Sequence, residues 1–284
     1  MRIVCHGGAG GEPEEPEPRQ AVLDEAAATG VAADDVVDAV VEAVAVLEAS
    51  PRFNAGYGGA IQSDGVVRTD AGIMTDDRAA GAVASTPGIE HAAAAARVVM
   101  EETPHVLVSG EHAVELAAEF GVETDAELLT EEARTEYEDA DPPEGSPRDH
   151  LDWLADRFGG HDTVGAVAHD PTTESFAAAT STGGRTFALA GRVGDVPQIG
   201  SGFFAAPAGG ASATGAGEDI AKATLSRRAV RHLEAGLDAQ AAADRAIAEF
   251  GELTGSSAGV IVLDEAGAGS AYNSDGMQTS VAVE

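Results

Sequence analysis

The residue best placed to do chemistry is Thr163, which stands between a Gly-Gly-His-Asp run at 159–162 and an apolar run at 164–168. A short valine-rich run bounded by glycines and by Asp170-Pro171 is typical of a buried strand. A threonine at the start of such a strand is usually an ordinary β-former. If the bond before it were cut, its free α-amine could act as general base for its own hydroxyl. The rest of the sequence has to decide between these interpretations.

A second candidate is the loop Gly191-Arg192-Val193-Gly194-Asp195, which holds a guanidinium and a carboxylate three residues apart. Arg192 could bind the α-carboxylate of an amino acid in a bidentate fork, and Asp195 could bind its ammonium group. The sequence is equally compatible with Arg192 and Asp195 pairing only with each other. The chain has few basic residues, so an arginine in a glycine-flanked loop is a notable feature.

Two further segments carry hydroxyls and glycines. Thr214-Gly215-Ala216-Gly217 leads from a strand into a helix start, where backbone N–H groups could bind an oxyanion. An ordinary capped helix with Glu218 in its first turn is the alternative. Thr182 ends the strand expected to pair with the one after Thr163, so its hydroxyl could contact Thr163; a hydroxyl-rich strand end is the alternative. The histidines show no zinc spacing, and no transition-metal site is expected.

The composition restricts the possible partners. The chain has 284 residues, 44% of them hydrophobic, which allows one large domain or two small ones. Its formal charge is −33 and Lys222 is its only lysine, so nucleic acid and anionic membranes are not expected as partners. Such acidity suggests a halophilic cytoplasm and predicts that low salt lowers the melting temperature. The single Cys5 excludes an intrachain disulfide, and no stretch reaches membrane-spanning length.

Hydrophobic patterning predicts that each half of the chain contains both strands and helices. Strands are expected at 2–5, 66–74, 81–85, 164–168, 175–181, 199–206, 211–214, 259–263 and 270–273, and helices at 34–50, 89–102, 111–120, 216–236 and 237–250. The acidic, proline-bearing segment at about 130–160 is expected to be a flexible linker. This order favours an α/β fold in which two packed sheets carry helices outside, a four-layer αββα arrangement over a single domain.

These segments occur together, in this order, in the plant-type L-asparaginase and isoaspartyl peptidase family, which the chain resembles over nearly its whole length. The motifs that carry the resemblance are His6-Gly7-Gly8-Ala9-Gly10, Phe53-Asn54-Ala55-Gly56, Thr163-Val164-Gly165-Ala166-Val167-Ala168, Ser181-Thr182-Gly183-Gly184, Gly191-Arg192-Val193-Gly194-Asp195, Thr214-Gly215-Ala216-Gly217-Glu218 and Asn273-Ser274-Asp275-Gly276-Met277. Family members are N-terminal nucleophile hydrolases with the αββα sandwich, so the resemblance implies that fold here.

The resemblance also implies autocleavage between Asp162 and Thr163, giving subunits 1–162 and 163–284. The mature enzyme would then hydrolyse L-asparagine, β-aspartyl dipeptides or both, with Thr163 as nucleophile. The other site residues implied are Thr182, which assists Thr163; Thr214 and Gly215, which stabilise the oxyanion; Arg192, Asp195 and Gly217, which hold the substrate; and Asn54 in a supporting position.

Three further properties are implied by the resemblance alone. Catalysis needs no cofactor, and the cleaved chains form an (αβ)2 dimer. A structural sodium ion would be bound by main-chain carbonyls of one loop, namely those of Leu47, Glu48, Ser50, Phe53, Ala55 and Tyr57.

The chain departs from the pattern just before the nucleophile. Most asparaginases of this type carry glycine there, whereas His161-Asp162 resembles the glycosylasparaginases, which cleave the link between a sugar and asparagine. That branch usually has Asn-Gly after the second threonine, where this chain has Gly183-Gly184, so asparaginase or isoaspartyl peptidase is favoured. Glycosylasparaginase and a non-enzymatic amino-acid-binding homologue stay as alternatives, and Asp162 is a hypothetical base in the cleavage step.

Overall fold

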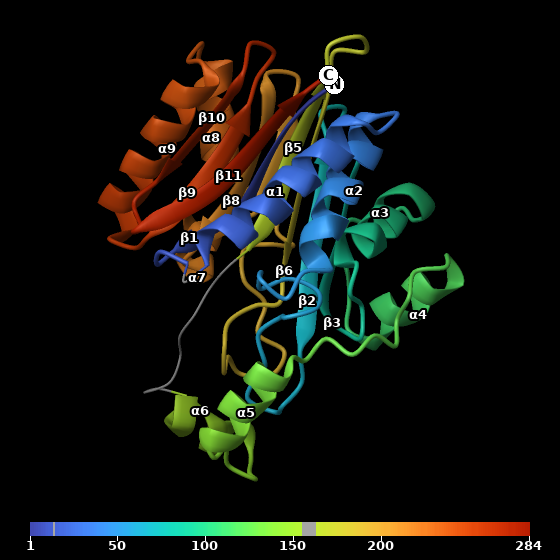
Figure 1. The fold of residues 1–284 in the computed structure, drawn as a ribbon, viewed down its shortest axis with the longest axis vertical. Coiled ribbons are helices and arrows are strands. Elements are labelled where there is room, and N and C mark those ends of the chain that lie inside the picture. The colour runs from blue at the N-terminus through green and yellow to red at the C-terminus, as the bar shows by residue number, and fades with distance from the viewer. Residues whose placement is uncertain (14, 155–162) are drawn as a thin grey trace.

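The computed structural model describes residues 1–13, 15–154 and 163–284. Two β-sheets pack face to face, and helices cover the outer face of each (Figure 1). One sheet has the strand order β11-β1-β5-β6-β2-β3-β4 and the other β10-β9-β8-β7. The predicted αββα sandwich is therefore confirmed.

The strands belong to the two sheets, and most of the helices cover one of them. The larger sheet contains β1 (Arg2–Gly10), β2 (Arg68–Thr75), β3 (Ala80–Pro87), β4 (Val108–Ser109), β5 (Val164–Asp170), β6 (Ser175–Thr182) and β11 (Gly276–Val283). The smaller contains β7 (Phe203–Ala206), β8 (Gly209–Gly215), β9 (Ala258–Leu263) and β10 (Ala268–Tyr272). Helices α1 (Pro16–Val31), α2 (Val36–Glu48), α3 (Ala92–Glu102) and α4 (Glu111–Glu119) accompany the larger sheet, and α7 (Gly217–Ala223), α8 (Leu225–Glu234) and α9 (Ala239–Thr254) the smaller.

Helix α2 shows how the sequence positions one layer. Asp35 caps its N-terminus by accepting hydrogen bonds from the backbone N–H groups of Val37 and Asp38. Val40, Val44 and Leu47 recur at helical spacing and are completely buried against the larger sheet. The helix predicted at 34–50 is confirmed, and it delivers the following loop to one end of that sheet.

Small residues allow the two sheets to approach closely. Strands β5 and β6 are rich in alanine and buried along nearly their whole length, as expected for strands covered on both faces. Gly72 faces the second sheet, and a Cβ on it would lie 1.9 Å from the Phe203 ring. Any larger residue at position 72 would push the sheets apart, so the low aromatic content reflects the close packing of this interface.

Several elements differ from the predictions. The helix expected at 216–236 is divided at Thr224, whose φ of 51° is left-handed and ends α7 before α8 begins. The strand expected at 199–206 begins only at Phe203. Helix α1 and strand β11 were not predicted at all, because β11 is a half-exposed strand at the edge of the sheet and lacks a buried apolar run.

The acidic segment expected to be a flexible linker contains two short helices, α5 (Glu131–Asp139) and α6 (Pro147–Leu154), at one end of the molecule (Figure 1). Tyr137 and Trp153 from these helices pack with Phe187, with ring centroids 5.1 to 6.5 Å apart. These aromatic contacts supply the apolar burial that composition alone did not reveal. Flexibility of the segment stays a prediction, and Asp162 lies outside the described residues. No helix in the described ranges is both long and apolar enough to span a bilayer.

Candidate active site

Thr163 and Thr182 lie at the same end of two paired strands. Val164 pairs with Ser181 in the antiparallel β5–β6 ladder, so the next step of the register places Thr163 opposite Thr182. Both side chains are buried. The Thr182 hydroxyl accepts a hydrogen bond from the Gly184 N–H at 3.0 Å and donates to the Asn54 carbonyl at 3.4 Å. Asn54 thus supports Thr182 through its main chain.

Thr214 reaches the same place from the second sheet. Gly210 faces Val167 across the interface, where an added Cβ would lie 2.6 Å from the valine side chain. Two residues further along each strand, Ser212 lies against Gly165. The next step of this spacing brings Thr214 towards Thr163, because alternate residues of a strand share a face. The Thr214 hydroxyl is fully buried and accepts a hydrogen bond from the Ala9 N–H at 3.2 Å.

A buried polar chain lies beneath these threonines. His6 Nε2 is 2.8 Å from the Ser212 hydroxyl, which is 2.7 Å from the Thr180 hydroxyl. Gly165 makes room for this chain, since a Cβ there would lie 2.0 Å from Ser212 Oγ and 2.6 Å from His6 Nε2. Burial lowers the pKa of His6 to about 3, although the neighbouring Thr163 backbone acts in the opposite direction, so the imidazole is neutral.

Arg192 and Asp195 converge on Gly217. A Cβ at Gly217 would lie 2.8 Å from both Arg192 Nη2 and Asp195 Oδ1, so only glycine lets the backbone approach this pair. Among the described residues, neither Arg192 Nη2 nor Asp195 Oδ2 has a hydrogen-bond partner, although both atoms are buried. A buried donor and a buried acceptor left open on these two side chains can receive the carboxylate and the ammonium of one amino acid.

Glu218 holds the two arginines of this region. Its carboxylate accepts from Arg192 Nε at 2.8 Å and lies 3.6 Å from Arg185 Nη1. Partial burial raises the pKa of Glu218, but the hydrogen bond and positive charge of Arg192 outweigh it and leave the pKa lowered. Arg192 therefore pairs through Nε with Glu218, which orients the rest of its guanidinium towards Gly217. The sequence suggested only a capping role for Glu218.

Asp70 is a site residue that sequence reasoning missed. It is buried on β2 directly opposite Thr182, and its Oδ1 accepts from the Ser85 N–H at 2.7 Å. Burial raises its pKa to about 7, opposed by the Ser85 hydrogen bond and by the charge of Arg192. Burial likewise raises the pKa of Asp195 to about 7. The signal in the sequence was a single carboxylate directly before the apolar residues 71–74 of a strand.

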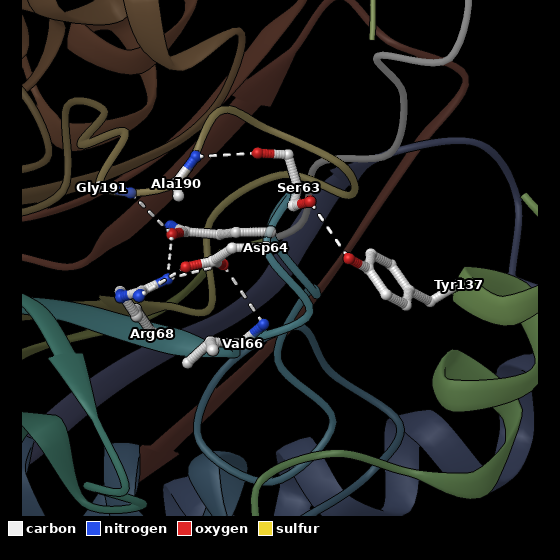
Figure 2. Close-up of polar contacts among 8 residues, drawn as sticks. Ser63, Asp64, Val66, Arg68, Tyr137, Ala190 and Gly191 are labelled. Carbon is white, nitrogen blue, oxygen red and sulfur yellow. Dashed lines mark hydrogen bonds and ion pairs between the residues drawn. The ribbon is translucent and has the colours of Figure 1, made fainter. Parts of the chain in front are cut away.

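Side-chain contacts anchor the loop that carries Arg192. Ser63 Oγ accepts from the Ala190 N–H at 3.1 Å, and Gln62 Oε1 accepts from the Gly191 N–H at 2.9 Å. Arg68 bonds to both Gln62 and Asp64 from the adjacent strand. Figure 2 shows the Tyr137 hydroxyl reaching the Ser63 main chain, at 3.1 Å, from the opposite side. This network ties the loop that carries Arg192 to α5.

The predicted sodium loop follows the end of α2. Three of its carbonyls accept hydrogen bonds from backbone N–H groups. The Leu47 carbonyl accepts from Ser50 at 3.3 Å, the Glu48 carbonyl from Tyr57 at 2.8 Å, and the Ser50 carbonyl from Phe53 at 3.2 Å. Gly56, with a φ of 53°, lets the chain turn back so tightly that a Cβ would lie 2.4 Å from the Glu48 carbonyl oxygen. A compact set of neutral carbonyls, each with a second lone pair, fits a hard cation of low charge. Within the described ranges, no group of three or more His, Cys, Asp or Glu side chains could hold a metal ion.

Comparison with known proteins decides the family. A model of the asparaginase family matches residues 1–284. The chain belongs to the asparaginase family. The fold and the resemblance inferred from the ordered motifs are thereby confirmed, since this is a family of amide-hydrolysing N-terminal nucleophile enzymes.

Relatives in this family span nearly the whole chain. A plant-type L-asparaginase of Pyrobaculum calidifontis is 43% identical over 278 residues, which cover 93% of this chain and 91% of the relative. An isoaspartyl peptidase/L-asparaginase of Danio rerio is 40% identical over 275 residues, covering 93% and 86%. A protein with the same name from Rattus norvegicus is 38% identical over 275 residues, covering 93% and 80%.

Proposed function

We propose that this protein hydrolyses the side-chain amide of L-asparagine and the isopeptide bond of β-aspartyl dipeptides, with Thr163 as the nucleophile. The proposal is supported by the strand register, which places Thr163 opposite Thr182 in one ladder, and by the strand spacing, which brings Thr214 towards Thr163 across the sheets. The site for an amino-acid head group at Arg192 and Asp195 lies beside them. The family supports the same reaction class.

Maturation begins in the intact chain. The Thr163 hydroxyl attacks the carbonyl carbon of residue 162, and the C–N bond breaks to leave an ester on Thr163 and a free α-amine. Water then hydrolyses the ester and releases the subunits 1–162 and 163–284. Asp162 is the hypothetical base that takes the hydroxyl proton in the first step; normal maturation of Asp162→Ala on a denaturing gel would exclude that role.

In the mature site the Thr163 amine takes the proton from its own hydroxyl while the oxygen attacks the amide carbon of the substrate. Thr182 hydrogen-bonds to Thr163, and the Thr214 hydroxyl and Gly215 N–H stabilise the oxyanion. Losing one such donor typically costs ~3 kcal/mol of transition-state stabilisation. The amine leaves with the proton from the Thr163 ammonium group, and water then hydrolyses the acyl-enzyme to release aspartate.

Charge complementarity selects the substrate. Arg192 takes the α-carboxylate and Asp195, in its ionised form, takes the α-ammonium group, while Gly217 provides the close backbone. We also infer that the loop carbonyls from Leu47 to Tyr57 hold a structural sodium ion and that the cleaved chains form an (αβ)2 dimer. Size-exclusion chromatography with light scattering tests the dimer, and the change in melting temperature on exchanging sodium for a bulky organic cation tests the ion.

One assay tests the reaction. Aspartate release is measured from L-asparagine, β-aspartyl-leucine and a glycosylated asparagine, beside a denaturing gel of the purified protein. Two fragments and release from the first two substrates are the expected results. Release from the glycosylated substrate alone would assign the protein to the glycosylasparaginase branch that His161-Asp162 resembles. A single full-length band with no release from any of the three would indicate a non-enzymatic binder.

A further inference from the structure

A large cavity opens beside the threonines and has no part in the steps derived so far. It has a volume of about 960 Å3 and is enclosed by the glycine loop of β1, the loop after α2, helix α5 and the start of β11. Its wall includes Gly8, Arg52, Asn54 and Met277. Because Asn54 also accepts the hydrogen bond from Thr182, the cavity is connected to the catalytic threonines through Asn54.

The strand order puts one wall of this cavity, formed by β1 and β11, and the head-group site on opposite sides of the nucleophile. Thr163 and Thr182 belong to the central β5–β6 pair. Asp70, next to Arg192, lies on β2 on one side of that pair, whereas Gly8 and Met277 lie on β1 and β11 on the other. A substrate whose aspartyl group is held by Arg192 and Asp195 would therefore direct its leaving group into the cavity.

The volume indicates what kind of leaving group fits. Ammonia, the leaving group of asparagine, needs no site of its own. Sites of about 300–1,000 Å3 accommodate ligands with many heavy atoms. The cavity therefore has room for a leaving residue, and the charges on its wall indicate the chemistry of that residue.

Two arginines of the described chain line the cavity, and they differ in exposure and in their partners. Arg19 is buried, lies 4.6 Å from the centre of the Phe53 ring, and donates to the Gly7 and Arg52 carbonyls and to Gln278. The Arg52 side chain is 36% exposed, and its Nη1 donates to the carboxylate of the exposed Glu15 at 2.7 Å. An exposed pair of this kind contributes little and can be exchanged for a ligand carboxylate.

We propose that this cavity is the subsite for the leaving residue of a β-aspartyl dipeptide, and that Arg52 binds the α-carboxylate of that residue. The proposal rests on the proposed function, because it assumes an aspartyl group at Arg192 and Asp195. A leaving residue linked through its α-nitrogen retains a free carboxylate and no ammonium group, so a single arginine complements its backbone charge. A sugar leaving group would lack this anion.

The opposite wall adds a preference for the side chain of the leaving residue. Glu132 and Glu136 line the cavity from α5 and are one helical turn apart, so both carboxylates share a face. A basic side chain on the leaving residue would be attracted to them and an acidic one repelled. The side-chain preference should decrease as salt rises, since both glutamates are exposed.

The test compares β-aspartyl-alanine with β-aspartyl-alaninamide, which differ only in the α-carboxylate. The mature wild-type enzyme should prefer the free acid by roughly tenfold in kcat/KM, and Arg52→Gln should bring the ratio close to one. Glu15→Gln removes the competing carboxylate and should increase the ratio. Arg227→Gln is the matched control, because Arg227 is similarly exposed at 34% and also pairs with a glutamate, but lies on α8.

The outcomes distinguish failure of the proposed subsite from failure of the proposed function. A wild-type ratio near one, or an unchanged ratio in Arg52→Gln, would overturn the subsite even if both substrates are cleaved. If neither dipeptide nor L-asparagine is cleaved by matured protein, the proposed function itself has failed. For the second wall, the ratio of β-aspartyl-lysine to β-aspartyl-glutamate hydrolysis should fall in Glu132→Gln/Glu136→Gln; an unchanged ratio would exclude that contribution.

Discussion

The two sides of Thr163 differ in how they are built. The head-group side is small and buried: Asp70 and Asp195 are 2% and 4% exposed, and Arg192 Nη2 and Asp195 Oδ1 approach Gly217 closely. The other side is a cavity of about 960 Å3 with charges at its exposed margin, such as Arg52.

The difference teaches where the specificity of this site lies. Buried charges interact in a low effective dielectric and leave no room for rearrangement, so a mismatched group is strongly rejected. Exposed charges are screened by water and salt and select only weakly. We therefore expect strict recognition of the aspartyl group and broad tolerance of the leaving group.

Thr163→Ala removes the nucleophile that lies between the two sides of the site. It should prevent the appearance of two fragments and lower kcat/KM for every substrate by about 10⁴-fold or more, because the residue supplies both nucleophile and base. Thr163→Ser keeps both groups and should still mature and turn over. A denaturing gel and an aspartate-release assay check both variants. Maturation of Thr163→Ala would place the cleavage elsewhere in the chain.

Arg192→Gln tests the buried side. Losing two charge-assisted hydrogen bonds should lower kcat/KM by about 10²–10³-fold. The factor should be the same for L-asparagine and β-aspartyl-leucine, because both share the aspartyl group. Steady-state kinetics with both substrates measure it. A loss confined to the dipeptide would reverse the assignment of the two sides.

The pH dependence of binding also belongs to the buried side. Burial raises the pKa of Asp195 to about 7, and only its ionised form can pair with the substrate ammonium group. Inhibition by L-aspartate should therefore weaken as pH falls below about 7, approaching tenfold per pH unit. Succinate, which lacks the ammonium group, should show no such weakening. Parallel profiles for the two inhibitors would remove Asp195 from ammonium recognition.

Asp70→Asn should raise stability at high pH. Burial raises the pKa of Asp70 from 3.8 to about 7, so the folded state binds more protons than the unfolded state between these values and stability falls as pH rises. The neutral amide removes this penalty, and after losing part of the Ser85 and Arg192 interactions we expect a gain of about 1–3 kcal/mol.

Thermal unfolding at pH 8 and pH 4 measures the effect, which should be present at the first pH and absent at the second. Asp244→Asn, at an exposed position on α9, is the control. An equal gain at both pH values would mean that the stabilisation does not come from the titration of Asp70.

Tyr137→Phe tests the open side with the smallest effect. It removes the hydrogen bond to the Ser63 carbonyl and leaves the ring packed on Trp153 and Phe187. The loss of about 1 kcal/mol should loosen α5 and raise KM for β-aspartyl-lysine roughly two- to fivefold, with a smaller change for L-asparagine. Tyr272→Phe, at a half-exposed position, is the control. Equal changes for both substrates would mean that the hydrogen bond acts through Ser63 on the loop of Arg192 and not through the leaving-residue subsite.

Much of the site could be predicted because its residues follow local signals. Thr163 begins a valine-rich strand, Thr182 ends its neighbour, and glycines flank Arg192 and Asp195. The sequence could not exclude that Arg192 and Asp195 pair only with each other. The structure excludes it, because Arg192 forms an ion pair with Glu218. Asp70 could not be assigned to the site from the sequence, because no local signal shows that its strand β2 pairs with the strand that ends in Thr182.

The sequence by itself determined the αββα fold, the order of its principal elements and the ordered motifs of the asparaginase family, because strand and helix periodicities and glycine-rich turns are local properties of the chain. Only the tertiary structure decided which charges are buried together and where the large cavity lies. Both depend on register and on the approach of the two sheets, which small residues such as Gly72 and Gly165 permit. The pairing of distant strands thus decides that one side of Thr163 is closed and the other open.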